Sequence, residues 1–211
     1  MAVNSANVFE EMKALYRKHM VLRAHFPYTS EEMIGQNVLQ TAPLYRKALG
    51  MDIVFDFEEP LTVKDIKNRN EIGGFLNENI IIRLCALLEE HKILLPRTEV
   101  DRTIEGYEAA NLVKKLRNAY AHSLGRPDAQ NPDHKALFRK LNAYLNPPDI
   151  FKIENAEHFP NDIDTVIIPL FRGCYKYAEG SLKKGQSDSP QAHMIIYDFN
   201  ITFSFGSIQI I

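Results

Sequence analysis

The sequence is poor in cysteine, in long apolar runs and in net positive charge, and each shortage excludes a class of protein. Only Cys85 and Cys174 occur among its 211 residues, both in apolar segments of helical character. This pattern favours buried thiols over a disulfide framework or a cysteine-based zinc site. No stretch approaches the roughly 18 continuous apolar residues of a membrane-spanning helix, so we expect no membrane partner. A formal net charge of −2 excludes a protein that coats nucleic acid by bulk charge, but it allows a local basic patch.

A targeting signal and the common motifs of catalysis are also missing. Residues 1–7 contain no basic run followed by an apolar core, which predicts a cytoplasmic protein. Gly73-Gly74 lacks the flanking pattern of nucleotide-binding loops, and no serine stands in a Gly-x-Ser-x-Gly elbow. His134 has no metal-binding residue near it at a suitable spacing. From these absences we expect neither a metal nor a cofactor.

Apolar side chains recur with the helical period through most of the chain. They predict helices over residues 8–23, 75–91, 105–120, 133–145 and 162–182, and a shorter helix that begins at Ser30 and ends before Pro43. Pro169 should kink or split the last of these helices, because proline lacks the N–H that a helix interior uses. Together these segments predict a bundle core over about residues 5–182.

Two further segments alternate apolar and polar residues, which is typical of half-buried strands. One covers residues 51–58 and the other covers residues 193–211. We expect them to pair with one another in a small antiparallel sheet. The predicted fold class is therefore mainly α, a helical bundle with a small antiparallel β element formed by the 51–58 and C-terminal strands. A single domain over residues 1–211 would contain both parts.

Arg117 and His122 are the strongest candidates for chemistry. Five residues at about 100° each would place them roughly 140° apart and about 7.5 Å along the axis of an unbroken helix. They can meet only if the helix unwinds near His122, and Gly125 and Pro127 supply such a break. A permanently charged guanidinium beside an imidazole that titrates near neutral pH is a suitable pair for phosphate chemistry.

The same two residues also have a purely structural interpretation. Cationic side chains near the C-terminus of a helix satisfy its unpaired carbonyl groups and complement its dipole. Such contacts typically stabilise a helix by about 0.3–1 kcal/mol each. The spacing alone does not decide between a functional site and a decorated helix end.

The segment around this pair resembles the motif of the HEPN superfamily, small helical-bundle domains with an Arg-x(4–6)-His sequence. The resemblance lies in Leu116-Arg117-Asn118-Ala119-Tyr120-Ala121-His122 and in Asn77-Glu78-Asn79-Ile80, which is similar to the polar-tipped core helix ahead of the family's motif. It covers residues 76–145 and extends to residues 162–182. The resemblance implies an HEPN-like bundle and a metal-independent endoribonuclease, usually a homodimer whose two motifs face each other across the interface.

The resemblance also implies a mechanism, in which a ribose 2′-OH attacks the adjacent phosphate of RNA. His122 would be the general acid/base, a role that contributes about 10²- to 10⁴-fold in rate. Arg117 would hold the phosphate and stabilise the charge that develops on it. Asn118 would orient His122 or bind the substrate, since positions i and i+4 share a helix face. The remaining candidates are Lys114, Lys115 and Arg126 for substrate binding, with Glu78 and Tyr120 in support.

The family context is defence, stress or toxin–antitoxin biology, with an antitoxin or regulatory protein as a further partner. Many toxin members carry a tyrosine two residues after the histidine, but here that position is Leu124. This departure weighs against regulation by tyrosine modification and against the usual nucleotidyltransferase-type antitoxin. The alternative is a non-catalytic HEPN-like module that dimerises and binds a nucleotide, RNA or a protein. A third hypothesis is an interaction protein whose C-terminal strands pair with another chain.

Overall fold

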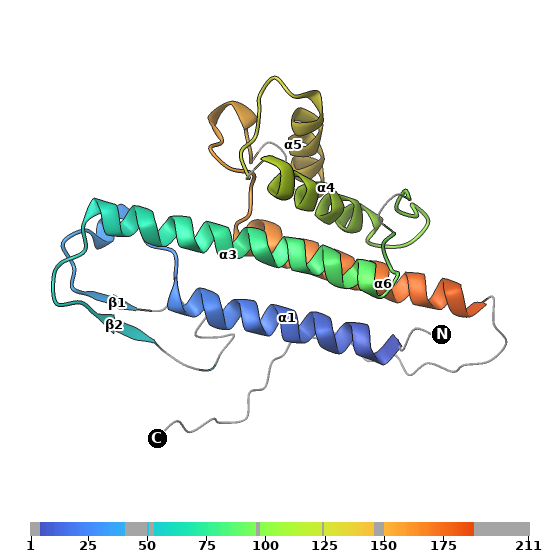
Figure 1. Cartoon of the computed structure of the whole chain (residues 1–211), viewed down its shortest axis with the longest axis horizontal. Helices are drawn as coiled ribbons and strands as arrows, with labels where there is room; N and C mark the ends of the chain where they lie inside the picture. The colour runs from blue at the N-terminus through green and yellow to red at the C-terminus, as the bar shows by residue number, and fades with distance from the viewer. Residues whose placement is uncertain are drawn as a thin grey trace. The chain divides into compact units, whose positions relative to one another are not determined.

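The chain is mainly helical in the computed structural model, which describes residues 5–40, 50, 53–95, 98–123, 125–145 and 150–187 (Figure 1). Its α-helices are α1 (Ser5–His25), α3 (Val63–Glu90), α4 (Tyr107–Ser123), α5 (Pro132–Leu145) and α6 (Ile168–Ser187). Short helical turns are η1 (Glu31–Met33), η2 (Ile153–Asn155) and the π-helical η3 (Ile163–Ile167). No helix in these ranges combines the length and the apolar character needed to cross a membrane.

The chain divides into two compact units. The first combines Met1–Leu15 with Asn77–Gln191, and the second contains Tyr16–Leu76. Both boundaries fall inside helices, because Leu15 and Tyr16 are neighbours in α1 while Leu76 and Asn77 are neighbours in α3. A single domain over residues 1–211 therefore stays a prediction.

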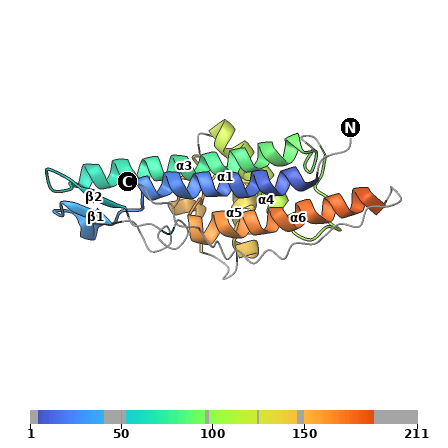
Figure 2. The same cartoon turned by 90° about the horizontal axis from the view of Figure 1, so that it is seen from below.

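The first unit is a bundle in which α4 packs against α5 and α6. Its part of α3 contacts α4 through the pair of Glu89 and Arg117, and the helices are drawn in Figure 1 and Figure 2. The start of α1 joins them through Phe9, whose ring centroid lies 4.6 Å from that of Tyr175. The apolar stripes recognised in the sequence form the core of this unit, including Leu112, Val113, Leu116, Ala119 and Tyr120 on α4 and Leu170, Cys174 and Tyr177 on α6. The predicted helices at these positions are confirmed.

The predicted interruption of the helix near Pro169 is confirmed. It lies in the turn just before this proline. The N–H of Ile167 donates to the carbonyl of Asp162 over 2.9 Å, a bond across five residues that widens this turn to a π-helix. Pro169 is then the second residue of α6. A proline is tolerated there because the first N–H groups of a helix have no partner within it.

The second unit contains the β element and corrects the prediction of a helix from Ser30. The helix expected from Ser30 is only the single turn η1, and strand β1 (Val38–Gln40) follows it. Gly35, at φ +81°, takes a left-handed conformation that ends the turn. Strand β2 (Val54–Asp56) pairs antiparallel with β1, in the register Leu39 to Phe55. The C-terminal strands predicted over residues 193–211 lie outside the described residues.

The predicted alternation of apolar inward-facing and outward-facing side chains within residues 51–58 is confirmed for residues 54–57. Phe55 and Phe57 are half-buried, while Val54 and Asp56 are exposed. The inner face of the sheet rests on a small core of Leu39, Leu61 and Ile66. This core joins β1 to the start of α3. Helix α3 begins at Val63, earlier than the predicted residue 75.

Thr62 caps the start of α3, and replacing it with alanine should destabilise this helix. Its hydroxyl accepts from the N–H of Asp65 over 3.3 Å, and Asp65 Oδ2 accepts from the N–H of Thr62 over 2.9 Å, which is a reciprocal capping box. We expect Thr62→Ala to lower the free energy of unfolding by about 1 kcal/mol. Urea denaturation followed by circular dichroism measures this change.

The cap should also weaken in acid. Hydrogen bonds from Thr62 lower the pKa of Asp65 below its ordinary value of 3.8. A lowered pKa in the folded state means that this stabilisation is present above that value and is lost as the pH falls through the folded pKa. The difference in stability between the wild type and Thr62→Ala should therefore narrow in strong acid, and a constant difference down to that pH would contradict the role of Asp65.

Candidate functional site

Helix α4 continues through the predicted site without unwinding. It runs to Ser123, and the left-handed Gly125, at φ +72°, follows its end. The break that was expected near His122 therefore comes too late to bend Arg117 and His122 towards each other, which corrects that prediction. On a regular helix the two side chains stay roughly 140° apart.

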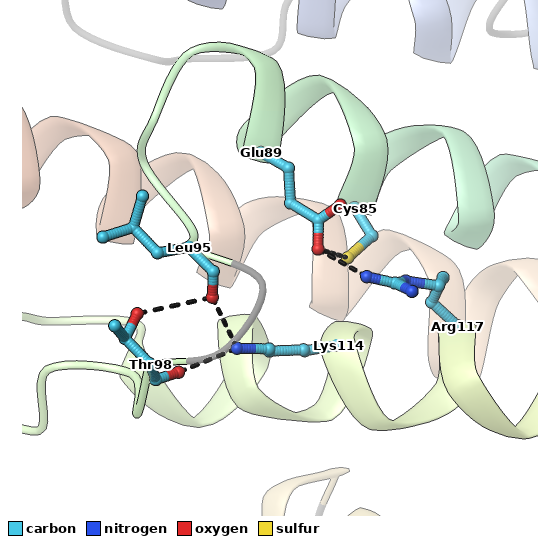
Figure 3. A network of polar contacts seen from close by, with 6 residues as sticks. All are labelled: Cys85, Glu89, Leu95, Thr98, Lys114 and Arg117. Carbon is cyan, nitrogen blue, oxygen red and sulfur yellow. Dashed lines mark hydrogen bonds and ion pairs between the residues drawn. The ribbon is translucent and has the colours of Figure 1, made fainter.

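Arg117 faces α3, where it forms an ion pair. Its Nη2 donates to Oε1 of Glu89, and both side chains are mostly buried, at 28% and 21% exposed (Figure 3). The thiol of Cys85 lies 3.8 Å from the same carboxylate oxygen. Burial raises the pKa of this thiol, so it stays neutral beside the pair. The charge of Arg117 is thus balanced within its own chain.

Lys114 lies one turn before Arg117 and anchors a loop. Its ammonium group donates to the carbonyl of Leu95 over 2.6 Å and to the carbonyl of Thr98 over 2.8 Å (Figure 3). These bonds tie the chain that follows α3 to the middle of α4. Lys114 therefore has a structural role in addition to any role in binding.

A cleft of about 580 Å³ opens between α4, α5 and the segment before α4. We call it the α4–α5 cleft. Its charged lining consists of the cationic Arg102, Lys114, Lys115 and Lys140 and the acidic Glu99 and Glu108. Four positive charges against two negative ones make the cleft basic, in a chain whose formal net charge is −2. Such local focusing of one sign of charge attracts anions.

The side of α4 that lines this cleft leads directly to His122. Asn111, Lys115 and Asn118 line the cleft, and their spacing places them on one helix face. His122 is four residues beyond Asn118, so it continues the same face by one turn. Both His122 and Asn118 are exposed. No hydrogen bond joins them in the described part of the chain, so the orienting role predicted for Asn118 stays a prediction.

Glu78 and Tyr120 support the end of α4 from inside. Glu78 on α3 lies so close to Gly125 that a Cβ there would come within 2.4 Å of its Oε1. Burial raises the pKa of Glu78, an effect that His158 opposes from 3.8 Å away. Tyr120 is buried and donates its hydroxyl to the carbonyl of Pro160 over 3.1 Å. Glu78 therefore lies against the turn after α4, and Tyr120 ties α4 to the segment before η3.

The structure thus brings only some of the sequence-predicted residues together. Lys114, Lys115 and Asn118 line the α4–α5 cleft, with His122 on the same side of the helix. Arg117 belongs to the contact with α3, and Arg126 is exposed after the helix ends. Leu124, the position of the family's tyrosine, lies outside the described residues.

Sequence reasoning did not single out Asn111, Arg102 or Lys140, which also line this cleft. Asn111 could have been found, because it precedes Lys115 by four positions and Asn118 by seven. Arg102 and Lys140 come from a loop and from another helix. No local spacing links them to α4, since only the tertiary fold brings them together.

The described residues contain no group of three or more side chains suited to holding a metal ion. Comparison with protein-family models, with curated proteins and with solved structures found no match. Membership of the HEPN superfamily therefore stays a prediction from the motif.

Proposed function

We propose that this chain is a cytoplasmic RNA-binding protein that holds the phosphate backbone of RNA in the α4–α5 cleft. The observation that carries the proposal is the excess of cationic over acidic side chains there, next to the amides of half-buried Asn111 and exposed Asn118. Lysine and arginine supply most of the affinity for nucleic-acid phosphates, and side-chain amides add hydrogen bonds. Exposed His122 extends this polar face at the end of α4.

Binding fits the geometry better than cleavage within one chain does. Arg117 is occupied by Glu89 and lies on a different side of α4 from His122. A phosphate held by Lys115 and Asn118 would approach His122 but not Arg117. This arrangement favours a non-catalytic HEPN-like module over an enzyme that acts as a monomer.

The second candidate function is the metal-independent endoribonuclease. The observation in its favour is that His122 is exposed and open to substrate. In a homodimer, Arg117 of one subunit would have to leave Glu89 and approach a phosphate beside His122 of the other. A defence, stress or toxin–antitoxin role, with an antitoxin as partner, belongs to this candidate.

His122→Ala distinguishes the two functions, and we expect it to weaken RNA binding by about 2- to 10-fold. That range corresponds to the loss of one hydrogen bond to the RNA. Binding is measured by fluorescence anisotropy with a labelled RNA, and cleavage is followed on gels in the presence of EDTA. His25→Ala, an exposed histidine of α1 outside the cleft, is the matched control.

The outcomes separate clearly. Binding without cleavage supports the non-catalytic module. Cleavage that His122→Ala and Arg117→Ala both abolish, while His25→Ala retains it, would instead establish the endoribonuclease. Light scattering of the same samples shows whether a dimer is present. A wild-type protein that neither binds nor cleaves RNA would refute both candidates.

A further inference from the structure

A second cleft continues the α4–α5 cleft around the start of α4. It has a volume of about 710 Å³ and lies between α6 and the segment that leads into α4. We call it the α6 cleft. The two clefts share Arg102, Tyr107, Glu108 and Tyr144 in their linings. They therefore form one path, in which the shared residues are the crossing point.

The α6 cleft adds positive charge to that path. Its lining includes Arg172, which is exposed, and Lys176, which is paired with Glu105. Over both clefts, six cationic side chains stand against three acidic ones. A basic path that is longer than one pocket suits a linear polyanion better than a single small ligand.

Aromatic rings lie at the crossing point between the two basic regions. Tyr107, the first residue of α4, is half-buried and lines both clefts, and its hydroxyl lies 3.2 Å from Oε1 of Glu108. Tyr144 on α5 also lines both, and it is held in place by a hydrogen bond of 3.1 Å from its hydroxyl to the carbonyl of Pro169. Burial raises the pKa of Tyr144 to about 12, so its hydroxyl remains a donor at neutral pH.

We infer that the RNA bound here is single-stranded, with one base stacked on Tyr107 and its flanking phosphates held by Lys115 on one side and by Arg172 on the other. This inference rests on the proposed RNA binding and names its substrate class. Single strands are bound by basic grooves that carry aromatic rings, because unpaired bases can turn out and stack. A duplex keeps its bases stacked inside and offers mainly its backbone and shape.

Tyr107→Ala tests the stacked base. The probe is a fluorescein-labelled 12-nucleotide RNA, used as a single strand and annealed to its complement, at about 50 mM salt. We expect the wild type to bind the single strand at least tenfold more tightly than the duplex. Tyr107→Ala should weaken single-strand binding by about 5- to 150-fold, the usual range for loss of one base stack. Tyr107→Phe, which keeps the ring, should stay within about twofold of the wild type.

Two controls keep the outcomes distinct. Tyr28→Ala removes an equally large, exposed tyrosine from the other unit and should change nothing. Arg172→Gln should lower the salt dependence of log K by about 0.7, the loss of one phosphate contact, whereas Arg139→Gln on α5 should not. Equal affinity for both RNA forms with no effect of Tyr107→Ala would overturn this inference and leave RNA binding intact. Absence of binding to either form would overturn the proposed function as well.

Discussion

Gly106→Ala is expected to lower the free energy of unfolding by about 3 kcal/mol. Gly106 has φ +85°, a left-handed conformation that costs any other residue roughly 1–2 kcal/mol. A Cβ at this position would also lie 2.0 Å from the carbonyl oxygen of Gly173 and 2.9 Å from the backbone N of Tyr177. Both atoms belong to the backbone of α6, which cannot yield without shifting the helix, and such overpacking adds about 1–3 kcal/mol.

Gly35→Ala is the matched control for this prediction. Gly35 has nearly the same conformation, at φ +81°, but a Cβ there would meet no atom within 4 Å. Gly35→Ala should therefore lower the free energy of unfolding only by the cost of the left-handed conformation, about 1–2 kcal/mol. Urea denaturation followed by circular dichroism compares the two variants. Equal losses of unfolding free energy in the two variants would show that the close contact with α6 adds nothing to the cost of Gly106→Ala.

That close approach depends on small residues that the sequence does not mark as special. Gly173 allows the same kind of contact from α6, because a Cβ there would lie 2.3 Å from Cβ of Ala109. The apolar stripe of α4 was predicted from the sequence because its period of 3.6 residues is a local property. The helix it packs against, and the distance between them, depend on glycines that could equally have marked loops.

The predicted pair of Arg117 and His122 shows how much depends on one helix end. Gly125 and Pro127 correctly indicate that α4 stops, but such signals locate an end only to within one or two residues. A stop before His122 would have allowed the pair to meet, and the actual end at Ser123 does not. The partner of Arg117 was equally hidden from the sequence, because Glu89 is 28 positions away on another helix.

The first half of α3 was missed for a similar reason. Gly73-Gly74 reads as a helix breaker, since glycine weakens a helix interior by about 1 kcal/mol. In the structure Gly73 leaves room for the buried side chain of Arg23, whose Nη1 would lie 2.0 Å from a Cβ at that position. Arg23 Nη1 in turn donates to the carbonyl of Phe26 over 2.6 Å. The glycine thus serves packing within the second unit, and no pattern local to residues 63–74 reveals it.

The charge of the α4–α5 cleft leads to the largest expected effect on binding. Lys115→Glu combined with Lys140→Glu should weaken RNA binding on the order of 100-fold at about 50 mM salt. Both side chains are exposed and line the cleft from facing helices. Each lysine that contacts a phosphate releases a counterion when RNA binds, so its loss lowers affinity most at low salt. The slope of log K against log salt should fall by about 1.4 in magnitude, the share of two contacts on a single strand.

The matched control is Lys18→Glu combined with Lys135→Glu, which gives the chain the same formal net charge. Lys18 on α1 and Lys135 on α5 are also exposed, but neither lines the cleft. If the cleft holds the RNA, only the first double variant loses the steep salt dependence, and the control keeps most of its affinity. If bulk charge were responsible, both variants would weaken equally. Because the whole chain is slightly acidic, the position of its positive charges, and not their number, must then decide which anion it binds.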